Sequence, residues 1–309
     1  MMAANKKDIL VVINPNSGKG NSLSIYDKFV YEFICNNFNS TILVSNYKNH
    51  INHYINNSDD KFDYILIMGG DGMIHLTLNA IINKGLTIPI GIIPTGSGNG
   101  LFKSITHENK MENNLIQSFE IIKSKKIKNI DLIKVSFPEK NKNLISCLGI
   151  SWGIISDLDI NTECMRVIGD LRFDIGAFWY ILRKKKYYGV LKYHKNDDEW
   201  EEVKGFFIHL WVCNTTHASE NTFSSPLSKL DDGYMYISYI LAPISRIELT
   251  KVMLKLNSGE FIYHPNVKYI KTKKFELNID DGMIVIDGER EYCKKINCEI
   301  MDDGYPFFG

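Results

Sequence analysis

The chain has 309 residues, 44% of them hydrophobic and 23% charged, which is ordinary for a globular protein and long for a single core. Its 36 basic and 36 acidic side chains cancel, so nothing in the overall charge indicates a nucleic-acid partner. No apolar run approaches the roughly 18 residues of a membrane span, and residues 1–8 lack a signal-peptide core. The six cysteines show no zinc spacing, so we expect reduced thiols in a cytoplasmic protein.

Strands and helices alternate through roughly the first 125 residues. Short apolar runs predict strands at residues 8–14, 41–45, 64–68 and 88–93. Apolar periodicity predicts helices at residues 23–36, 73–82 and 111–123. A further helix is predicted to end at about residue 57. Such alternation is typical of a parallel sheet with helices on both faces.

Three of the predicted strands end in turns rich in glycine and small polar residues. They are Asn14-Pro15-Asn16-Ser17-Gly18-Lys19-Gly20, Gly69-Gly70-Asp71-Gly72 and Pro94-Thr95-Gly96-Ser97-Gly98-Asn99-Gly100. Because parallel strands end at one sheet edge, these turns together predict a phosphate cradle of backbone N–H groups. The first turn is not a Walker loop, since its glycine spacing before the lysine differs. The alternative is that the glycines only serve the turns themselves.

Asp71 is the single charge in the second turn. A carboxylate there could hold Mg²⁺, or it could accept a proton from an attacking hydroxyl. Gly-Asp-Gly is also common in ordinary tight turns between a strand and a helix, so the residues alone leave both interpretations open.

From about residue 130 the chain consists mainly of short runs with β-branched and aromatic residues. Predicted strands lie at residues 131–137, 144–148, 190–193, 203–213, 234–240, 268–270, 274–277 and 283–286. Two helices are predicted at 157–183 and 245–256. We therefore expect an α/β domain over residues 1–127 and a mainly antiparallel β-sandwich domain over residues 128–309.

These motifs, in this order, resemble the lipid-kinase superfamily of diacylglycerol and sphingosine kinases, and sphingosine kinases most of all. Three further blocks carry the likeness: Ser151-Trp152-Gly153-Ile154-Ile155-Ser156-Asp157-Leu158-Asp159, Arg166-Val167-Ile168-Gly169-Asp170-Leu171-Arg172-Phe173, and Asp287-Gly288-Glu289. The resemblance implies a Rossmann-like, phosphofructokinase-like nucleotide-binding domain of the diacylglycerol-kinase catalytic type, followed by a lipid-binding domain.

The resemblance also implies ATP and Mg²⁺, with Asp71 as the catalytic residue and a possible metal ligand. The residues it implies for the nucleotide are Asn14, Pro15, Asn16, Ser17, Gly18, Lys19, Gly20, Gly70, Gly72, Thr95, Gly96, Ser97, Gly98, Asn99, Arg166, Arg172, Asp287, Gly288 and Glu289. Without it, the Asp-Gly-Glu segment is typical of a plain hairpin turn, and the two arginines are typical of exposed helix charges.

For the lipid, the resemblance implies Asp159, Ile155, Phe173, Phe178 and His217. Asp159 matches the carboxylate that holds the amino and hydroxyl head group. Asp157 lies two residues before it and would point elsewhere on a helix, so at most one of the two faces the pocket. His75 and His209 are predicted to be structural.

The expected function is ATP-dependent phosphorylation of the primary hydroxyl of sphingosine, or of a related sphingoid base, to the 1-phosphate. The protein is expected to be cytoplasmic and to visit a membrane surface transiently, where the basic residues 183–186 could touch anionic head groups. One alternative is a kinase for diacylglycerol or another neutral lipid. Another is a catalytically silent lipid- or nucleotide-binding protein, which Leu76 supports because relatives commonly carry Glu there.

Overall fold

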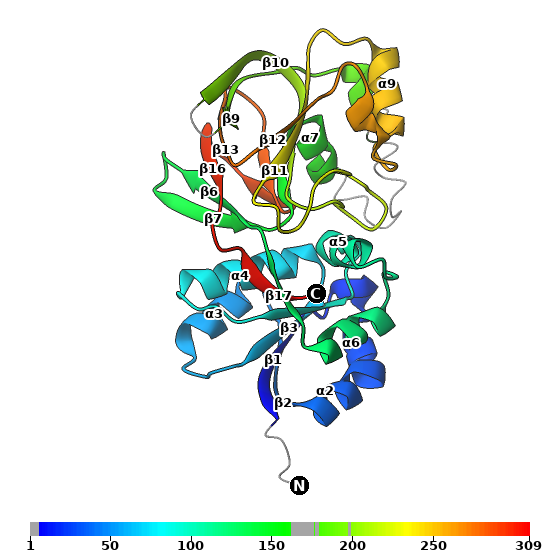
Figure 1. Ribbon diagram of the computed structural model, residues 1–309, viewed down its shortest axis with the longest axis vertical. Coiled ribbons are helices and arrows are strands. Elements are labelled where there is room, and N and C mark those ends of the chain that lie inside the picture. Colours follow the sequence, from blue (N-terminus) through cyan, green and yellow to red (C-terminus); the bar gives the residue numbers. More distant parts are fainter. Residues whose placement is uncertain (1–5, 162–175, 177–178, 197–198) are drawn as a thin grey trace. The chain divides into compact units, whose positions relative to one another are not determined.

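The computed structural model describes residues 6–161, 176, 179–196 and 199–309, and only the backbone of residues 159 and 161. The chain forms two compact units (Figure 1). The first runs up to Ile130 and takes in Asp303–Gly309 from the C-terminus, and the second comprises Asp131–Asp302.

The first unit is built on a six-stranded sheet whose central strands are buried on both faces. Its strands are β1 (Lys7–Ile13), β2 (Phe38–Val44), β3 (Tyr64–Gly69), β4 (Ile90–Pro94), β5 (Ile127–Ile130) and β17 (Tyr305–Phe308), in the order β2-β1-β3-β4-β17-β5. Strands β1 to β4 pair in parallel, and only the β17–β5 pair is antiparallel. Continuous burial from Ile9 to Ile13 fits a parallel sheet covered by helices on both sides.

Helices cover both faces of this sheet. They are η1 (Ser17–Gly20), α1 (Ser22–Ile25), η2 (Tyr26–Val30), α2 (Tyr31–Asn37), α3 (His50–Asn57), α4 (Asp71–Asn83), α5 (Gly100–Glu108) and α6 (Leu115–Ser124). Val30, Ile34 and Ile122 pack on one face, and α3 and α4 lie on the other (Figure 1). The sequence predicted α6 but missed α5, which starts directly after the third glycine turn and buries Leu101 and Phe102.

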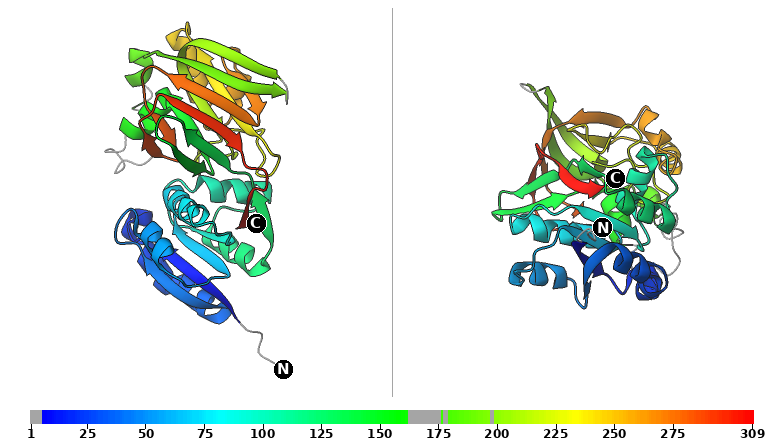
Figure 2. Two further views of the ribbon diagram at one scale, coloured as in Figure 1. Left: turned by 90° about the vertical axis from the view of Figure 1, so that its left-hand side faces the viewer. Right: turned by 60° about the horizontal axis from the view of Figure 1, so that its bottom comes forward.

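The last strand, β17, belongs to the first unit, whereas the sequence placed all of residues 128–309 in the second domain. It pairs with β4 at Phe307 and Ile90 and with β5 from Tyr305 to Phe308 (Figure 2). The Tyr305 hydroxyl also lies 3.0 Å from the carbonyl oxygen of Ile88. A short apolar run carries no information about which of two sheets it joins. The sequence alone therefore did not reveal that the C-terminus returns to the first sheet.

The second unit is mainly an antiparallel β structure. Its strands are β6 (Ile133–Phe137), β7 (Lys142–Ser146), β8 (Gly149–Gly153), β9 (Tyr187–Asn196), β10 (Glu199–Cys213), β11 (Met235–Leu241), β12 (Lys268–Thr272), β13 (Lys274–Ile279), β14 (Ile284–Ile286), β15 (Glu289–Glu291) and β16 (Lys295–Ile300). Their order is β15-β14-β8-β10-β9-β13-β16-β6-β7, with β11 joining β10 to β12. The predicted class, a parallel α/β domain followed by an antiparallel β domain, is confirmed.

Strand β10 organises this second unit because it pairs differently along its length. Its first part, up to Phe207, pairs with β9, and from His209 onward it pairs with β8. Its register against β11 shifts between Phe207 and His209, as at a β-bulge. Phe207 therefore packs in the main core with Trp152. Ile208 packs in a second cluster with helices α7 (Ile154–Asn161) and α9 (Arg246–Leu254) and the short helix η4 (Glu260–Tyr263).

Within the described residues, no helix has the length and apolar character needed to cross a bilayer.

The position of β17 generates a stability prediction. Phe307 is fully buried between β4 and β5, so we expect Phe307→Ala to lower the free energy of unfolding by about 3–5 kcal/mol. Phe29 lies in the same unit and is 56% exposed, so Phe29→Ala should change the free energy of unfolding by less than about 0.5 kcal/mol. Urea unfolding followed by circular dichroism measures both, and equal losses would contradict the burial of β17.

Candidate active site

The three glycine turns lie against one another at the carboxyl ends of β1, β3 and β4. The backbone N–H groups of Thr95 and Gly96 both donate to the Gly69 carbonyl, each at 3.2 Å. The N–H of Asn14 donates to the Met68 carbonyl at 2.9 Å, and the hydroxyls of Ser22 and Thr95 are 3.3 Å apart. The structure thus brings together residues 14–20, 69–72 and 94–100.

The glycines in these turns fall into two groups. A Cβ on Gly96 would lie 2.4 Å from the Gly70 Cα, and one on Gly18 would lie 2.9 Å from the Thr95 carbonyl oxygen, so both are needed for the turns to pack. A Cβ on Gly72 or Gly20 would meet nothing within 4 Å. The main chain at these two positions is open to an approaching group, as a phosphate cradle requires.

Backbone conformation marks the first turn as unusual. Gly18, Lys19 and Gly20 have φ of 62°, 59° and 85°, all in the left-handed region. A lysine there is uncommon, and such residues gather at functional sites. The Lys19 side chain is exposed, so its cation is presented to solvent at the edge of the three turns.

Asn99 is used to build the third turn. It also has a left-handed backbone, with φ of 51°, which asparagine tolerates better than most residues. Its side-chain oxygen accepts from the Gly96 N–H at 3.0 Å, and its amide donates to the Gly96 carbonyl at 2.8 Å. This reciprocal pair closes the loop, and the Asn99 carbonyl then accepts from Lys103 in the first turn of α5.

Asp71 joins the second turn to the third. One carboxylate oxygen accepts from the Gly100 N–H at 2.9 Å and the other from the Leu101 N–H at 3.2 Å. These are N–H groups of the first turn of α5, whose positive dipole end favours a carboxylate. These two bonds hold the carboxylate in one orientation.

The Asp-Gly-Glu segment lies in the second unit, in the turn between β14 and β15. Asp287 and Gly288 have φ of 49° and 84°, as in a two-residue hairpin turn with both central residues left-handed. The Asp287 carboxylate is buried and accepts from the Ser146 hydroxyl and from the N–H groups of Cys147, Leu148 and Gly149, at 2.7–3.0 Å. Asp287 therefore holds the β7–β8 turn, and Glu289 is half-buried at the start of β15.

Several residues of the resemblance fall outside the described part of the chain. Arg166, Arg172, Phe173 and Phe178 are among them, and of Asp159 only the backbone, in α7, is described. Two residues earlier, the Asp157 carboxylate accepts a short hydrogen bond from the Tyr187 hydroxyl. Burial raises the pKa of that phenol, and the Asp157 carboxylate raises it further.

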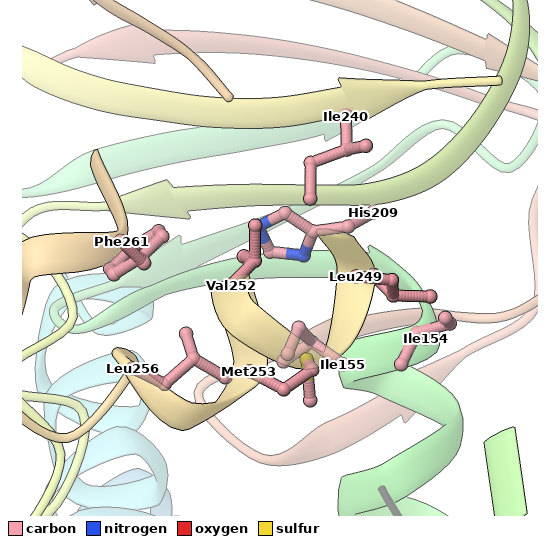
Figure 3. A pocket seen from close by; sticks show the side chains of 9 residues that line it. All are labelled: Ile154, Ile155, His209, Ile240, Leu249, Val252, Met253, Leu256 and Phe261. Carbon is pink, nitrogen blue, oxygen red and sulfur yellow. The ribbon is translucent and has the colours of Figure 1, made fainter. Parts of the chain in front are cut away.

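An apolar pocket lies in the second unit between β10, β11, α7 and α9 (Figure 3). Its lining residues, among those described, are Ile154, Ile155, His209, Ile240, Leu249, Val252, Met253, Leu256 and Phe261. Its cavity is about 10 Å³, about enough for one water. Of the predicted lipid residues, Ile155 lines it. His217 does not: it is buried elsewhere, stacked on Phe223 at 4.6 Å, with Nδ1 2.8 Å from the Thr216 hydroxyl.

Sequence reasoning missed the place of His209 in this pocket and the capping role of Asp71. Strict alternation along β10 would put His209 on one face with Phe207, but the bulge separates them. The capping contact joins Asp71 to residues 29 and 30 positions away. Nothing local in the sequence indicates either contact.

The donor groups of the described residues limit how a metal ion could be held. Among the described residues, no cluster of three or more His, Cys, Asp or Glu side chains could enclose a metal ion. Mg²⁺ does not need one, because it is commonly held by one or two carboxylates together with substrate phosphates and waters. Asp71, beside the open main chain of Gly72, fits that mode.

Comparisons with known proteins assign both parts of the chain. Residues 8–135 match the diacylglycerol kinase catalytic domain, and residues 153–300 match the YegS C-terminal NAD kinase beta sandwich-like domain. The chain therefore contains both of these domains, and it is a kinase.

Individual relatives agree in name but are distant in sequence. Sphingosine kinase 1 of Arabidopsis thaliana is 26% identical over 92% of this chain and 68% of its own length. Sphingosine kinase 1 of Homo sapiens is 22% identical over 91% of this chain and 85% of its own. A crystal structure of a diacylglycerol kinase from Bacillus anthracis has the same fold, with a TM-score of 0.70 at 14% identity over 99% of this chain and 98% of that one.

The two groups of glycines generate a paired stability prediction. Gly96→Ala forces the second and third turns apart and should lower the free energy of unfolding by at least about 2 kcal/mol. Gly72→Ala adds a methyl group into open space in the first turn of α4 and should leave stability unchanged or raise it by about 0.5 kcal/mol. Chemical denaturation of both variants measures the difference, and similar losses in the two would show that the turns are not packed as described.

Proposed function

We propose that this kinase transfers the γ-phosphate of ATP to the primary hydroxyl of sphingosine or a related sphingoid base. The observation that carries the proposal is the convergence of three glycine turns beside Asp71, whose carboxylate is held in one orientation by the start of α5. The names of the sequence relatives, which are sphingosine kinases in plant and animal, support the lipid class.

The phosphates of ATP are proposed to lie on the open backbone of the turns. Gly20 and Gly72 leave space beside the main chain, and Lys19 adds an exposed cation. The rest of the proposed nucleotide set is Asn14, Pro15, Asn16, Ser17, Gly18, Gly70, Thr95, Gly96, Ser97, Gly98, Asn99, Arg166, Arg172, Asp287, Gly288 and Glu289. Within that set, Gly18, Gly96, Asn99 and Asp287 have packing or hydrogen-bonding roles in the fold, and they would act by shaping the loops rather than by side-chain contact.

Asp71 is proposed to accept the proton of the lipid hydroxyl. That oxygen forms a bond to the γ-phosphorus, the bond from phosphorus to the β-phosphate oxygen breaks, and the proton passes to the carboxylate. Mg²⁺ bound with the nucleotide would spread the negative charge of the phosphates. Two backbone hydrogen bonds keep Asp71 from rotating away, so no reorganisation is needed when the hydroxyl arrives.

The lipid is proposed to be held by the second unit. Asp159 would pair with the cationic amine of the head group, and apolar residues including Ile155, Phe173 and Phe178 would receive the chain. His217, which is buried against Phe223, would act by shaping the fold rather than by contacting the lipid. The enzyme is proposed to work in the cytoplasm and to meet its substrate at a membrane surface. Arg183 and the lysines after it provide a basic segment suited to anionic head groups.

Replacing the proposed base tests the chemistry. We expect Asp71→Asn to lower kcat by about 10²–10⁴-fold, with a much smaller change in KM for the lipid, because proton transfer is needed only in the transition state. The remaining amide oxygen can still accept one N–H of α5, so the thermal midpoint should fall by only a few degrees. Steady-state kinetics with radiolabelled ATP and sphingosine, with thermal unfolding in parallel, measure both effects.

Asp63→Asn is the matched control for this variant. Asp63 precedes β3, whereas Asp71 follows it, about 20 Å further along an extended strand. The control makes the same change of charge in the same unit. It affects only surface contacts, the ion pair with Lys7 and the hydrogen bond that Asp63 accepts from the Asp8 N–H, so kcat should be preserved. Near-normal turnover in Asp71→Asn would remove this residue from the mechanism. If the wild type phosphorylated none of the lipids, the alternative of a catalytically silent lipid- or nucleotide-binding protein would be supported instead.

Substrate class is tested at Asp159. A carboxylate favours a cationic amine over a neutral glyceride, so Asp159→Ala should reduce the preference for sphingosine over diacylglycerol by about tenfold or more. Asp157→Asn is the control from the same helix. It disturbs the bond to Tyr187 and so lowers stability, and it should leave the preference unchanged. Competition between the two lipids for labelled ATP measures the preference for sphingosine over diacylglycerol. An unchanged preference in Asp159→Ala would refute the head-group assignment.

A further inference from the structure

Asn99 occupies the position directly before α5, where an asparagine usually caps the helix. In the usual arrangement the capping residue is extended, and its side-chain oxygen accepts an N–H of the first helical turn. Asn99 differs in both respects. Its φ and ψ are 51° and 37°, in the left-handed region, and within the described chain its side chain accepts no N–H of α5. The first turn of α5 is therefore not capped by the residue that precedes it.

The side chain of Asn99 faces back onto its own loop. Its oxygen accepts from the Gly96 N–H at 3.0 Å, and its amide donates to the Gly96 carbonyl at 2.8 Å. A Cβ on Gly96 would lie 2.8 Å from that side-chain oxygen, and one on Gly70 would lie 3.9 Å from it, so the amide is packed against both turns. Asn99 is buried. The two bonds therefore hold the left-handed turn and keep the side chain directed away from α5.

The N–H groups that Asn99 leaves uncapped are bound by Asp71 from the second turn. The Gly100 N–H donates to one carboxylate oxygen at 2.9 Å, and the Leu101 N–H donates to the other at 3.2 Å. A side chain that capped α5 from position 99 would compete with Asp71 for the Leu101 N–H, since a cap normally binds the second or third N–H of the helix. The left-handed conformation of Asn99 therefore keeps these donors available for the carboxylate.

These contacts form a closed ring between the second and third turns. The Gly96 N–H also donates to the carbonyl of Gly69, two residues before Asp71, at 3.2 Å. The ring thus runs from Gly69 through Gly96 and Asn99 to the start of α5, and it returns to the second turn at the Asp71 carboxylate. Two side chains take part in it, those of Asn99 and Asp71, and its other links are backbone groups. Replacing Asn99 therefore loosens the ring while Asp71 itself stays intact.

We propose that Asn99 is a positioning residue for phosphoryl transfer: it holds the start of α5 where the uncapped N–H groups orient the carboxylate of Asp71. The inference rests on the proposed function and deepens it, because the side chain of Asn99 acts on the proposed base rather than on the nucleotide. A carboxylate without these donors must be reoriented in each catalytic cycle. The loss on replacing Asn99 therefore falls on the chemical step and leaves substrate affinity largely unchanged.

Two variants of the full-length protein test the inference by kinetics. Asn99→Gly removes the pair with Gly96 but still adopts a left-handed backbone easily. We expect kcat to fall by about 10–10²-fold, as for small displacements of a catalytic group, with little change in KM for ATP or for sphingosine. A raised KM for ATP with preserved kcat would show that Asn99 contacts the nucleotide, and it would overturn the inference. Unchanged kcat and KM would overturn it as well.

Asn99→Ser separates positioning from stability. Serine is a preferred capping residue and would accept the Leu101 N–H itself, so the helix keeps a cap while Asp71 loses a donor. We expect kcat to fall at least as far as in Asn99→Gly, with a smaller loss in the thermal midpoint. A folded Asn99→Ser with wild-type turnover would refute the positioning role.

Asn114→Gly is the matched control. Asn114 precedes α6 in the same unit and caps that helix in the usual way, with its side-chain oxygen accepting the Gln117 N–H at 3.0 Å. The control makes the same replacement directly before a different helix, so kcat should be preserved. An equal fall of kcat in Asn99→Gly and Asn114→Gly would mean that general loosening of the unit causes the loss, and the inference would fail.

A measurement without turnover separates this inference from the proposed function. Labelling of glycine carbonyl carbon and leucine nitrogen selects the amides of Leu86 and Leu101, because only these leucines follow a glycine. The Leu101 amide resonance reports its bond to Asp71, Asp71→Asn shows its position without the carboxylate, and Leu86 serves as the reference. In Asn99→Gly we expect the Leu101 resonance to move toward that position, whereas Asn114→Gly should leave it in place.

The two failures then differ. If the wild type phosphorylates no sphingoid base but Asn99→Gly shifts the Leu101 resonance in this way, the proposed function is wrong and the positioning of Asp71 by Asn99 stands. If the wild type phosphorylates sphingosine but the Leu101 resonance is the same in Asn99→Gly, the proposed function stands and the positioning role is refuted.

Discussion

The structure of the first unit depends on the close approach of two backbones, at Gly70 and Gly96, which leaves no room for a side chain between them. That approach places the carbonyl of Gly69 where two N–H groups of the third turn reach it. It also brings the start of α5 to the carboxylate of Asp71. The residue proposed for proton transfer is thus also the residue that ties two loops together, so catalysis and local stability are coupled at one side chain.

The second unit distributes its polar groups differently. Asp287 is surrounded by donors of the β7–β8 turn, and Asp157 is bound by a phenol whose pKa is raised. Both carboxylates therefore stabilise the fold through their hydrogen bonds. His209 is the opposite case, because half of its hydrogen-bonding capacity is left without a partner among the described residues.

Relatives at 22–27% identity match more than nine-tenths of the chain. The glycine turns tolerate little change, since a glycine whose Cβ would collide with another backbone has no substitute. The side chains that line an apolar pocket are less restricted than these glycines. An apolar wall can exchange one hydrophobic side chain for another without disturbing the three glycine turns.

The sequence by itself determined the alternation of strands and helices, the three glycine turns and the change to short antiparallel strands near residue 130. These follow from local composition and spacing, whereas the resemblance to sphingosine kinases rests on the motifs themselves. Only the tertiary structure decided that β17 joins the first sheet, that α5 exists and is held by Asp71, and that His209 faces an apolar pocket. The reason is that these features depend on partners far apart in the chain. The bulge in β10 also breaks the alternation from which side-chain direction is predicted.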